Sequence, residues 1–199
     1  MTSITQKTSI IALSALIVAF AMPSAFAGAG TVEAYYWQNN PRFCNVTGEL
    51  STLGTLSQIT AELDDSRATY NAEMNGITIN AHNGSCSTNV IINGAYDMGW
   101  WSTILAQNTA TWVHPLPAVN SLDVQFIDFN NAKPFAIESN SCSWTGFDIE
   151  WVMNHELGHA VGLKHHDHNP AESIMDPTCD AKWEALQTVD KTAIDIKYP

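Results

Sequence analysis

Positive charge is scarce in this chain of 199 residues, in which 8 Lys and Arg stand against 20 Asp and Glu. The formal net charge is −12, whereas proteins that bind nucleic acid need an excess of positive charge to pair with phosphates, so we expect no nucleic-acid partner. The 14% of charged residues argues against a long coiled coil, and four cysteines are too few for a disulfide-dense miniprotein. The 45% of hydrophobic residues is enough to fill the core of one domain.

Long apolar runs are also rare, and the most prominent one, residues 10–22, falls short of the roughly 20 residues that span a bilayer. It follows Lys7 and precedes a small-residue pattern at residues 25–27, an order typical of a secretory signal peptide cleaved directly after that pattern. We therefore predict a signal peptide over residues 1–27 and a single domain over residues 28–199. We expect the protein to be secreted, after passage through the periplasm if it is bacterial, with no membrane anchor after processing.

The four cysteines never show the short Cys-x2-Cys spacing of zinc tetrathiolate sites. An even number in an exported chain instead predicts disulfides, here two. Three pairings are compatible with the sequence, and the pairs Cys44–Cys86 and Cys142–Cys179 are favoured because each closes a loop within one half of the chain.

Apolar periodicity predicts three helices in the mature chain. The first spans residues 57–74, the second begins near Thr145, which with Asp148 fits a capping box, and runs to Val161, and the last begins near Thr188. Segments rich in β-branched and aromatic residues predict strands at residues 77–80, 90–92, 111–114 and 124–129. This order of elements predicts an α+β fold, with an α/β layer arrangement as the alternative.

The second helix carries the sequence His155-Glu156-Leu-Gly-His159. Residues four apart lie one above the other on a helix, so the two histidines can present ring nitrogens to one cation. Gly162 can adopt the left-handed conformation that ends a helix, which lets His165 return as a third ligand. Three neutral imidazoles suit Zn²⁺ and leave a position for water, which is the pattern of a catalytic site. Glu156, beside a ligand, is the predicted general base and acid for a zinc-bound water.

An ordinary core helix is the alternative interpretation of this segment. It would place two histidines and a glutamate against an apolar interior without evident partners, which is costly. The added glycine and third histidine also make a chance match far rarer than for the short motif alone. We therefore predict a metal site.

The stretch from His155 to His165 resembles the extended zinc signature of the metzincin metallopeptidases, and Ser173-Ile-Met175-Asp-Pro is similar to their Met-turn. The matrixin branch is the most similar. The resemblance implies a twisted, mostly parallel sheet and two long helices above an active-site cleft, in an upper part over residues 28–162. It implies a small irregular lower part over residues 163–199 that ends in a helix, with Met175 as an apolar floor under the ligands.

The same resemblance implies a protein or peptide substrate that pairs with a strand at the edge of the cleft, for which residues 135–138 are the candidate. Residues just past Met175 would form a wall of the pocket for the side chain that follows the cleaved bond. Pro177 stands where some metzincins carry a tyrosine that supports the oxyanion, so that role has no candidate here.

The interval from His165 to Met175 is longer than usual for matrixins and contains His166, Asp167 and His168 as rival ligands. Spacing favours His165. Pro41 to Cys44 resembles the segment with which matrixin propeptides block the zinc, but an extra Phe43 breaks the match, and a structural disulfide is the favoured role of Cys44.

Tryptophan is frequent, with seven residues. Trp100, Trp101, Trp112, Trp144 and Trp151 fall within predicted elements, so we expect them to fill the core, with surface-glycan binding as the alternative. The acidity of the chain is compatible with Ca²⁺, but no calcium loop is visible and no site is assigned.

These observations predict a secreted zinc endopeptidase that acts as a monomer. The alternative is a non-catalytic exported module that binds a surface or matrix and keeps zinc only for stability. Glu156 favours the enzyme, because a structural zinc site has no use for a carboxylate beside a ligand.

Overall fold

The computed structural model describes residues 32–33, 35–81, 86, 89–116, 119–137, 142–143, 145–166, 173–177 and 185–199. The predicted signal peptide lies outside this part of the chain. Among the described helices, none combines the length and the apolar composition that a bilayer-spanning segment requires.

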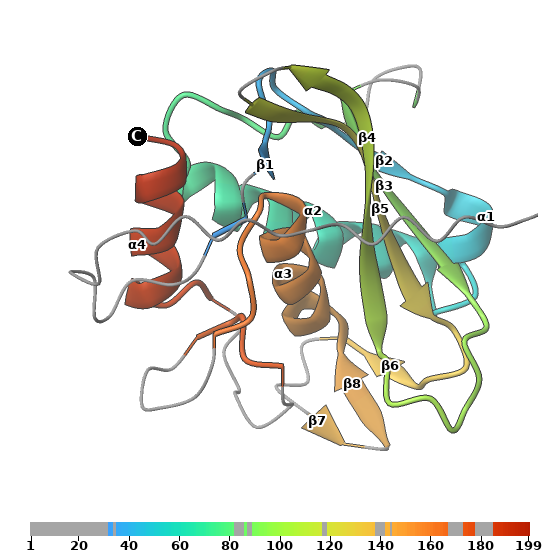
Figure 1. The fold of residues 1–199 in the computed structure, drawn as a ribbon. Helices are drawn as coiled ribbons and strands as arrows, with labels where there is room; N and C mark the ends of the chain where they lie inside the picture. Colours follow the sequence, from blue (N-terminus) through green and yellow to red (C-terminus); the bar gives the residue numbers. More distant parts are fainter. Residues whose placement is uncertain are drawn as a thin grey trace, which may run out of the picture.

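A five-stranded sheet forms the centre of the described fold (Figure 1). Its strands are β1 (Tyr35–Tyr36), β2 (Arg42–Asn45), β3 (Val90–Tyr96), β4 (Ala106–Leu116) and β5 (Val119–Asn130). β5 pairs in parallel with β1 and β3, and β2 continues the sheet in parallel beyond β3. β4 is antiparallel to β5 and lies along the opposite edge of that strand. The prediction of a mostly parallel sheet in an α+β fold is thus confirmed.

The strand predicted at residues 77–80 does not form; only an isolated bridge joins Arg42 to Asn80. The reason lies in the helix Leu56–Glu73 (α2), where the side-chain amide of Asn71 pairs with the backbone of Ile79. Its Oδ1 accepts from the Ile79 N–H at 2.7 Å, and its Nδ2 donates to the Ile79 carbonyl at 2.9 Å. The N–H and carbonyl groups of Ile79 are therefore already hydrogen-bonded and do not pair with a neighbouring strand.

The two long helices are α2 (Leu56–Glu73) and α3 (Ile149–Ala160), and α1 (Thr47–Leu50) and α4 (Thr188–Lys197) are shorter. The buried hydroxyl of Tyr70 on α2 donates to the backbone carbonyl of Asn154 on α3 at 2.6 Å. Figure 1 shows α4 on the far side of α3 from the sheet. The division of the domain into an upper and a lower part at residue 162 stays a prediction.

α3 begins at Ile149, four residues later than predicted, because residues 146–148 form a strand. A small sheet of β6 (Phe135–Ala136), β7 (Cys142–Ser143) and β8 (Gly146–Asp148) has the order β6-β8-β7 and leads directly into the helix. Asp148, not Thr145, caps α3, since its Oδ1 accepts a hydrogen bond from the Trp151 N–H at 3.1 Å.

The predicted disulfide between Cys44 and Cys86 is present. It joins β2 to the segment that precedes β3, and Cys44 is buried. A sulfur in this bond cannot serve as a thiolate ligand, so the structural role of Cys44 is the correct one of the two considered. Cys179, and with it the second expected bridge, lies outside the described residues.

The tryptophans do not all fill the core. Trp151 is buried, as expected, but Trp100 is 47% exposed and Trp101 is 92% exposed, so for these two the prediction is wrong. They lie in the connection between β3 and β4 rather than in a regular element, and a loop there leaves its side chains on the surface. The side chains of Trp112 and Trp144 lie outside the described part of the structure.

Candidate metal centre

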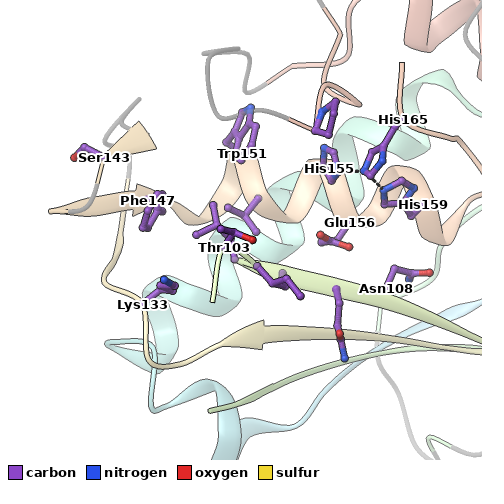
Figure 2. A pocket seen from close by; sticks show the side chains of 16 residues that line it. Thr103, Asn108, Lys133, Ser143, Phe147, Trp151, His155, Glu156, His159 and His165 are labelled. Atoms are coloured by element: carbon purple, nitrogen blue, oxygen red, sulfur yellow. Dashed lines mark hydrogen bonds between the residues drawn. The ribbon is translucent and has the colours of Figure 1, made fainter. Parts of the chain in front are cut away.

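The three histidines of the motif meet at one point. His155 and His159 lie one turn apart on α3, with ring centroids 4.9 Å from each other. The Nε2 atom of His165 lies 3.1 Å from Nε2 of His155 and 3.0 Å from Nε2 of His159 (Figure 2). Among the described residues, these three form the one group of His, Cys, Asp or Glu side chains that could hold a metal ion.

A tight turn brings His165 back to the helix. Gly162 has a φ of 90°, a left-handed conformation that side chains disfavour, and it directly follows the last helical turn. The Leu163 N–H donates to the Gly158 carbonyl at 2.8 Å, which closes the end of α3. Val32 pairs with Leu163 in an isolated antiparallel bridge and so holds the turn from outside.

The hydrogen bonds of Nδ1 in His155 and His159 determine which ring nitrogen faces the point where the three histidines meet. Nδ1 of His155 lies 2.8 Å from the carbonyl oxygen of Ile174, and Nδ1 of His159 lies 2.9 Å from that of Leu163. A carbonyl only accepts hydrogen bonds, so each Nδ1 carries the proton of its neutral ring and each Nε2 carries a lone pair. Such contacts orient the histidines of metal sites.

The charge state of the rings agrees with this arrangement. Burial, together with the neighbouring His159, lowers the pKa of His155 to about 3, and burial lowers the pKa of His159 to about 4. Both rings are therefore neutral at pH 7, the form in which histidine binds zinc. Converging lone pairs repel each other unless a cation lies between them, so the residues present fit a Zn²⁺ ion.

Met175 packs against α3 beside the histidines. Its side chain is buried and contacts Gly158, the residue directly before His159. The preceding residue, Ile174, supplies the carbonyl that orients His155. The Met-turn thus contacts the helix through one side chain and one backbone oxygen.

Asp190 on α4 holds this turn in place and was not singled out from the sequence. Its buried carboxylate accepts from the Ser173 hydroxyl at 2.6 Å, from the Ile174 N–H at 3.0 Å and from the Gln187 N–H at 2.9 Å. The signal that could have pointed to it is the capping pair of Gln187 and Asp190 at the start of α4.

Glu156 is buried beside the histidines, and Figure 2 shows its carboxylate close to the three rings. Burial raises the pKa of this side chain to about 8. Of the rival ligands, His166 does not belong to the group formed by the other three histidines. Its backbone N–H donates to the Met175 carbonyl at 3.0 Å. Asp167 and His168 lie outside the described residues.

A cavity of about 570 Å³ opens in front of the triad. Glu156, Val152 and Pro177 contribute to its wall, together with residues 103–108, which lead into β4 and form its start. The expected edge strand at residues 135–138 is not in this position. Its described part forms β6, which pairs with β8, while β4 borders the cavity and pairs with β5 alone among the described strands.

Comparison with known proteins agrees with the motif. Residues 103–199 match the sequence model of the matrixin family. A search of the curated proteins found no match. The family match and the histidine triad together support a zinc metallopeptidase.

Proposed function

We propose that this chain, whose residues 103–199 match the sequence model of the matrixin family, is a secreted zinc endopeptidase that hydrolyses internal peptide bonds. The observation that carries the proposal is the buried carboxylate of Glu156 next to three convergent imidazoles on the wall of a cavity. His155, His159 and His165 would hold the ion. When bound, zinc supplies Lewis-acid polarisation of a carbonyl and activation of water near neutral pH.

Glu156 would move the proton. A carboxylate shielded from solvent takes a proton more readily than an exposed one, which the raised pKa of this side chain reflects. In its ionised form, which the positive charge of a bound zinc ion would favour, this carboxylate would accept the proton of the attacking water and pass it to the amine that leaves. The neutral Nδ1–H groups of His155 and His159 would stay bound to their backbone carbonyls during these transfers.

The free edge of β4 supports a polypeptide substrate. Beyond its pairing with β5, no other described strand covers this edge. An extended peptide can add to such an edge through backbone hydrogen bonds, which need no particular sequence. The cavity beside it, with Val152 and Pro177 in its wall, would take one side chain of the substrate.

Secretion rests on the sequence of residues 1–27 and agrees with the Cys44–Cys86 bridge, since disulfides persist in oxidising compartments. A monomer and the absence of a nucleic-acid partner remain predictions.

The decisive experiment compares Glu156→Ala with the wild-type protein. The variant should bind zinc as the wild type does and lose about 10²–10⁴-fold in peptide cleavage, the usual contribution of a general base. Asp195→Ala, an exposed acid on α4, is the matched control and should keep full activity. A wild-type protein that binds zinc but cleaves no member of a peptide library would instead support a non-catalytic module. Undiminished cleavage by Glu156→Ala would refute the role given to Glu156.

A further inference from the structure

Exposed large apolar side chains are concentrated in one short segment. Of the five in the described part of the chain, four lie between residues 96 and 104 and one lies on α4. The four are Tyr96 at the end of β3, Trp100, Trp101 and Ile104, and the fifth is Ile196. Single exposed apolar residues are ordinary, but four within nine residues of the chain point to a binding surface.

The backbone of this segment is held by a buried side chain. Asn130, at the end of β5, donates through Nδ2 to the carbonyls of Gly99 at 3.3 Å and Ile104 at 3.0 Å, and its Oδ1 accepts from the Met98 N–H at 3.1 Å. One amide thus ties both ends of the turn that carries the two tryptophans. The exposed rings are therefore presented by a fixed loop, which lowers the entropy that binding would cost.

Two further side chains, those of Lys133 and Gln107, hold the segment. The ammonium group of Lys133, which is buried, donates to the carbonyl of Trp100 at 2.5 Å and lies 5.6 Å from the centre of its ring. The Tyr96 hydroxyl accepts a hydrogen bond from Nε2 of Gln107 at 2.6 Å. Gln107 and Lys133 also line the cavity in front of the triad, so the same residues support both features.

The segment continues without a break into the wall of that cavity. Thr103 and Ile104 line the cavity, and Figure 2 shows Thr103 between Lys133 and the histidines. A polypeptide that leaves the cavity past Ile104 would meet the segment that carries Trp100 and Trp101. The nine residues from 96 to 104 contain a single charge, that of Asp97, so the surface favours apolar rather than ionic contacts.

We propose that Tyr96, Trp100, Trp101 and Ile104 form a docking surface for the part of the polypeptide substrate that lies outside the cavity. This inference rests on the proposed endopeptidase function. It defines the substrate class as polypeptides that carry an aromatic or large aliphatic side chain a few residues from the cleaved bond. Rigid aromatic side chains at such positions provide most of the affinity of many interfaces.

Trp101→Ala tests the proposal, and Ile196→Ala is the control because it removes an exposed apolar side chain on α4, outside residues 96–104. The first substrate is a short fluorogenic peptide. The others are the same peptide extended at either end by residues that include Phe, and control peptides whose extension contains only Gly and Ser. For one of the Phe-containing extensions, Trp101→Ala should lower kcat/KM about 5–20-fold, with less than a twofold change on the short peptide. Trp101→Phe should retain most of the kcat/KM that the wild type shows on the Phe-containing extension. Ile196→Ala should change kcat/KM on neither the short nor the extended peptide.

A second measurement separates this proposal from the proposed function. The Phe-extended peptide is titrated into the Glu156→Ala protein and into the Glu156→Ala, Trp101→Ala double variant, with binding followed by fluorescence anisotropy. Weaker binding by the double variant supports docking even if no peptide is cleaved, an outcome that would refute only the endopeptidase. Equal binding and equal kinetics for all extensions would overturn the docking surface. So would a loss in Trp101→Ala confined to self-association, to binding of a soluble polysaccharide or to binding of phospholipid vesicles.

Discussion

The side chain of Met175 occupies the space that a side chain at residue 158 would need. A Cβ built on Gly158 would overlap the sulfur of Met175 and would lie only 2.7 Å from the hydroxyl of Tyr70. Both neighbours are buried, and Tyr70 is bound to the carbonyl of Asn154 on the same helix. Gly158 is therefore the residue that lets α2 and the Met-turn approach the helix carrying His155 and His159.

Gly158→Ala should destabilise the fold even though alanine is the better helix former. Overpacking against two buried neighbours costs about 1–3 kcal/mol, and over most of this range it exceeds the roughly 1 kcal/mol that alanine contributes inside a helix. We expect a lower free energy of unfolding in urea and weaker zinc binding in a competitive titration. Gly48→Ala is the control, because nothing lies within 4 Å of its Cβ position on α1, and it should change stability by no more than about 1 kcal/mol. Wild-type stability in Gly158→Ala would contradict this account of the packing.

The features predicted correctly from the sequence are those set by local geometry. The spacing of His155 and His159 on a helix and the glycine turn at Gly162 bring the three histidines of the motif together. The parallel strands were visible for a similar reason, since their buried runs are continuous. The pattern of apolar residues, histidines and glycines within a short stretch of sequence is enough for such predictions.

The features missed depend on contacts between distant segments. Nothing in the neighbourhood of Asp190 shows that its carboxylate reaches Ser173 and Ile174 on another element. Analogy with the family predicts the edge strand at residues 135–138, whereas pairing with β5 puts β4 beside the cavity. Tryptophan is a residue type that usually packs in cores, and only the fold reveals that Trp101 is exposed.

Asp190→Asn should affect both stability and the metal site. The carboxylate of Asp190 accepts from three donors, and the NH₂ group of an asparagine would face at least one of them. A buried donor that loses its acceptor costs about 1–3 kcal/mol. Because Ile174 orients His155, we also expect zinc affinity to fall by up to about 10-fold, toward the lower end of the effects seen for outer contacts of metal ligands. Urea unfolding and a zinc titration measure the two effects separately.

Asp195→Asn on the same helix is the comparison for this variant, since Asp195 is exposed and should change stability by less than about 0.5 kcal/mol. If Asp190→Asn loses stability while its zinc affinity equals that of the wild type, the link from α4 through the Met-turn to His155 is not energetically significant.

The buried carboxyl of Glu156 should make the metal-free protein less stable as the pH rises. Burial raises its pKa from 4.5 to about 8 in the folded state. Between these pH values the folded protein keeps a proton that the unfolded chain has released. The contribution of Glu156 to stability is therefore fully present below about pH 4.5 and is lost toward pH 8, by at most about 1.4 kcal/mol per pH unit.

Glu156→Gln removes this titration, so its stability relative to the wild type should increase steadily from pH 5 to pH 8. Urea unfolding in the presence of a chelator measures the difference at each pH. Glu156→Ala, which also lacks the carboxyl group, should follow the same trend from a different starting value. A difference that does not change with pH would show that the carboxyl is ionised at little cost in the folded protein.

The Cys44–Cys86 bridge should stabilise the fold without affecting the metal site. It closes a loop with a sequence separation of 42 residues, and in the chain-entropy model a loop of this size is worth up to about 4 kcal/mol. Replacement of both residues, Cys44→Ala in the buried strand and Cys86→Ser at the surface, should lower the free energy of unfolding by about 2–4 kcal/mol. Zinc affinity at a temperature where the variant is folded should equal that of the wild type, because neither cysteine belongs to the triad. A reductant should bring the wild type close to the variant and change the variant less, and a variant as stable as the oxidised wild type would show that the bridge adds nothing to the fold.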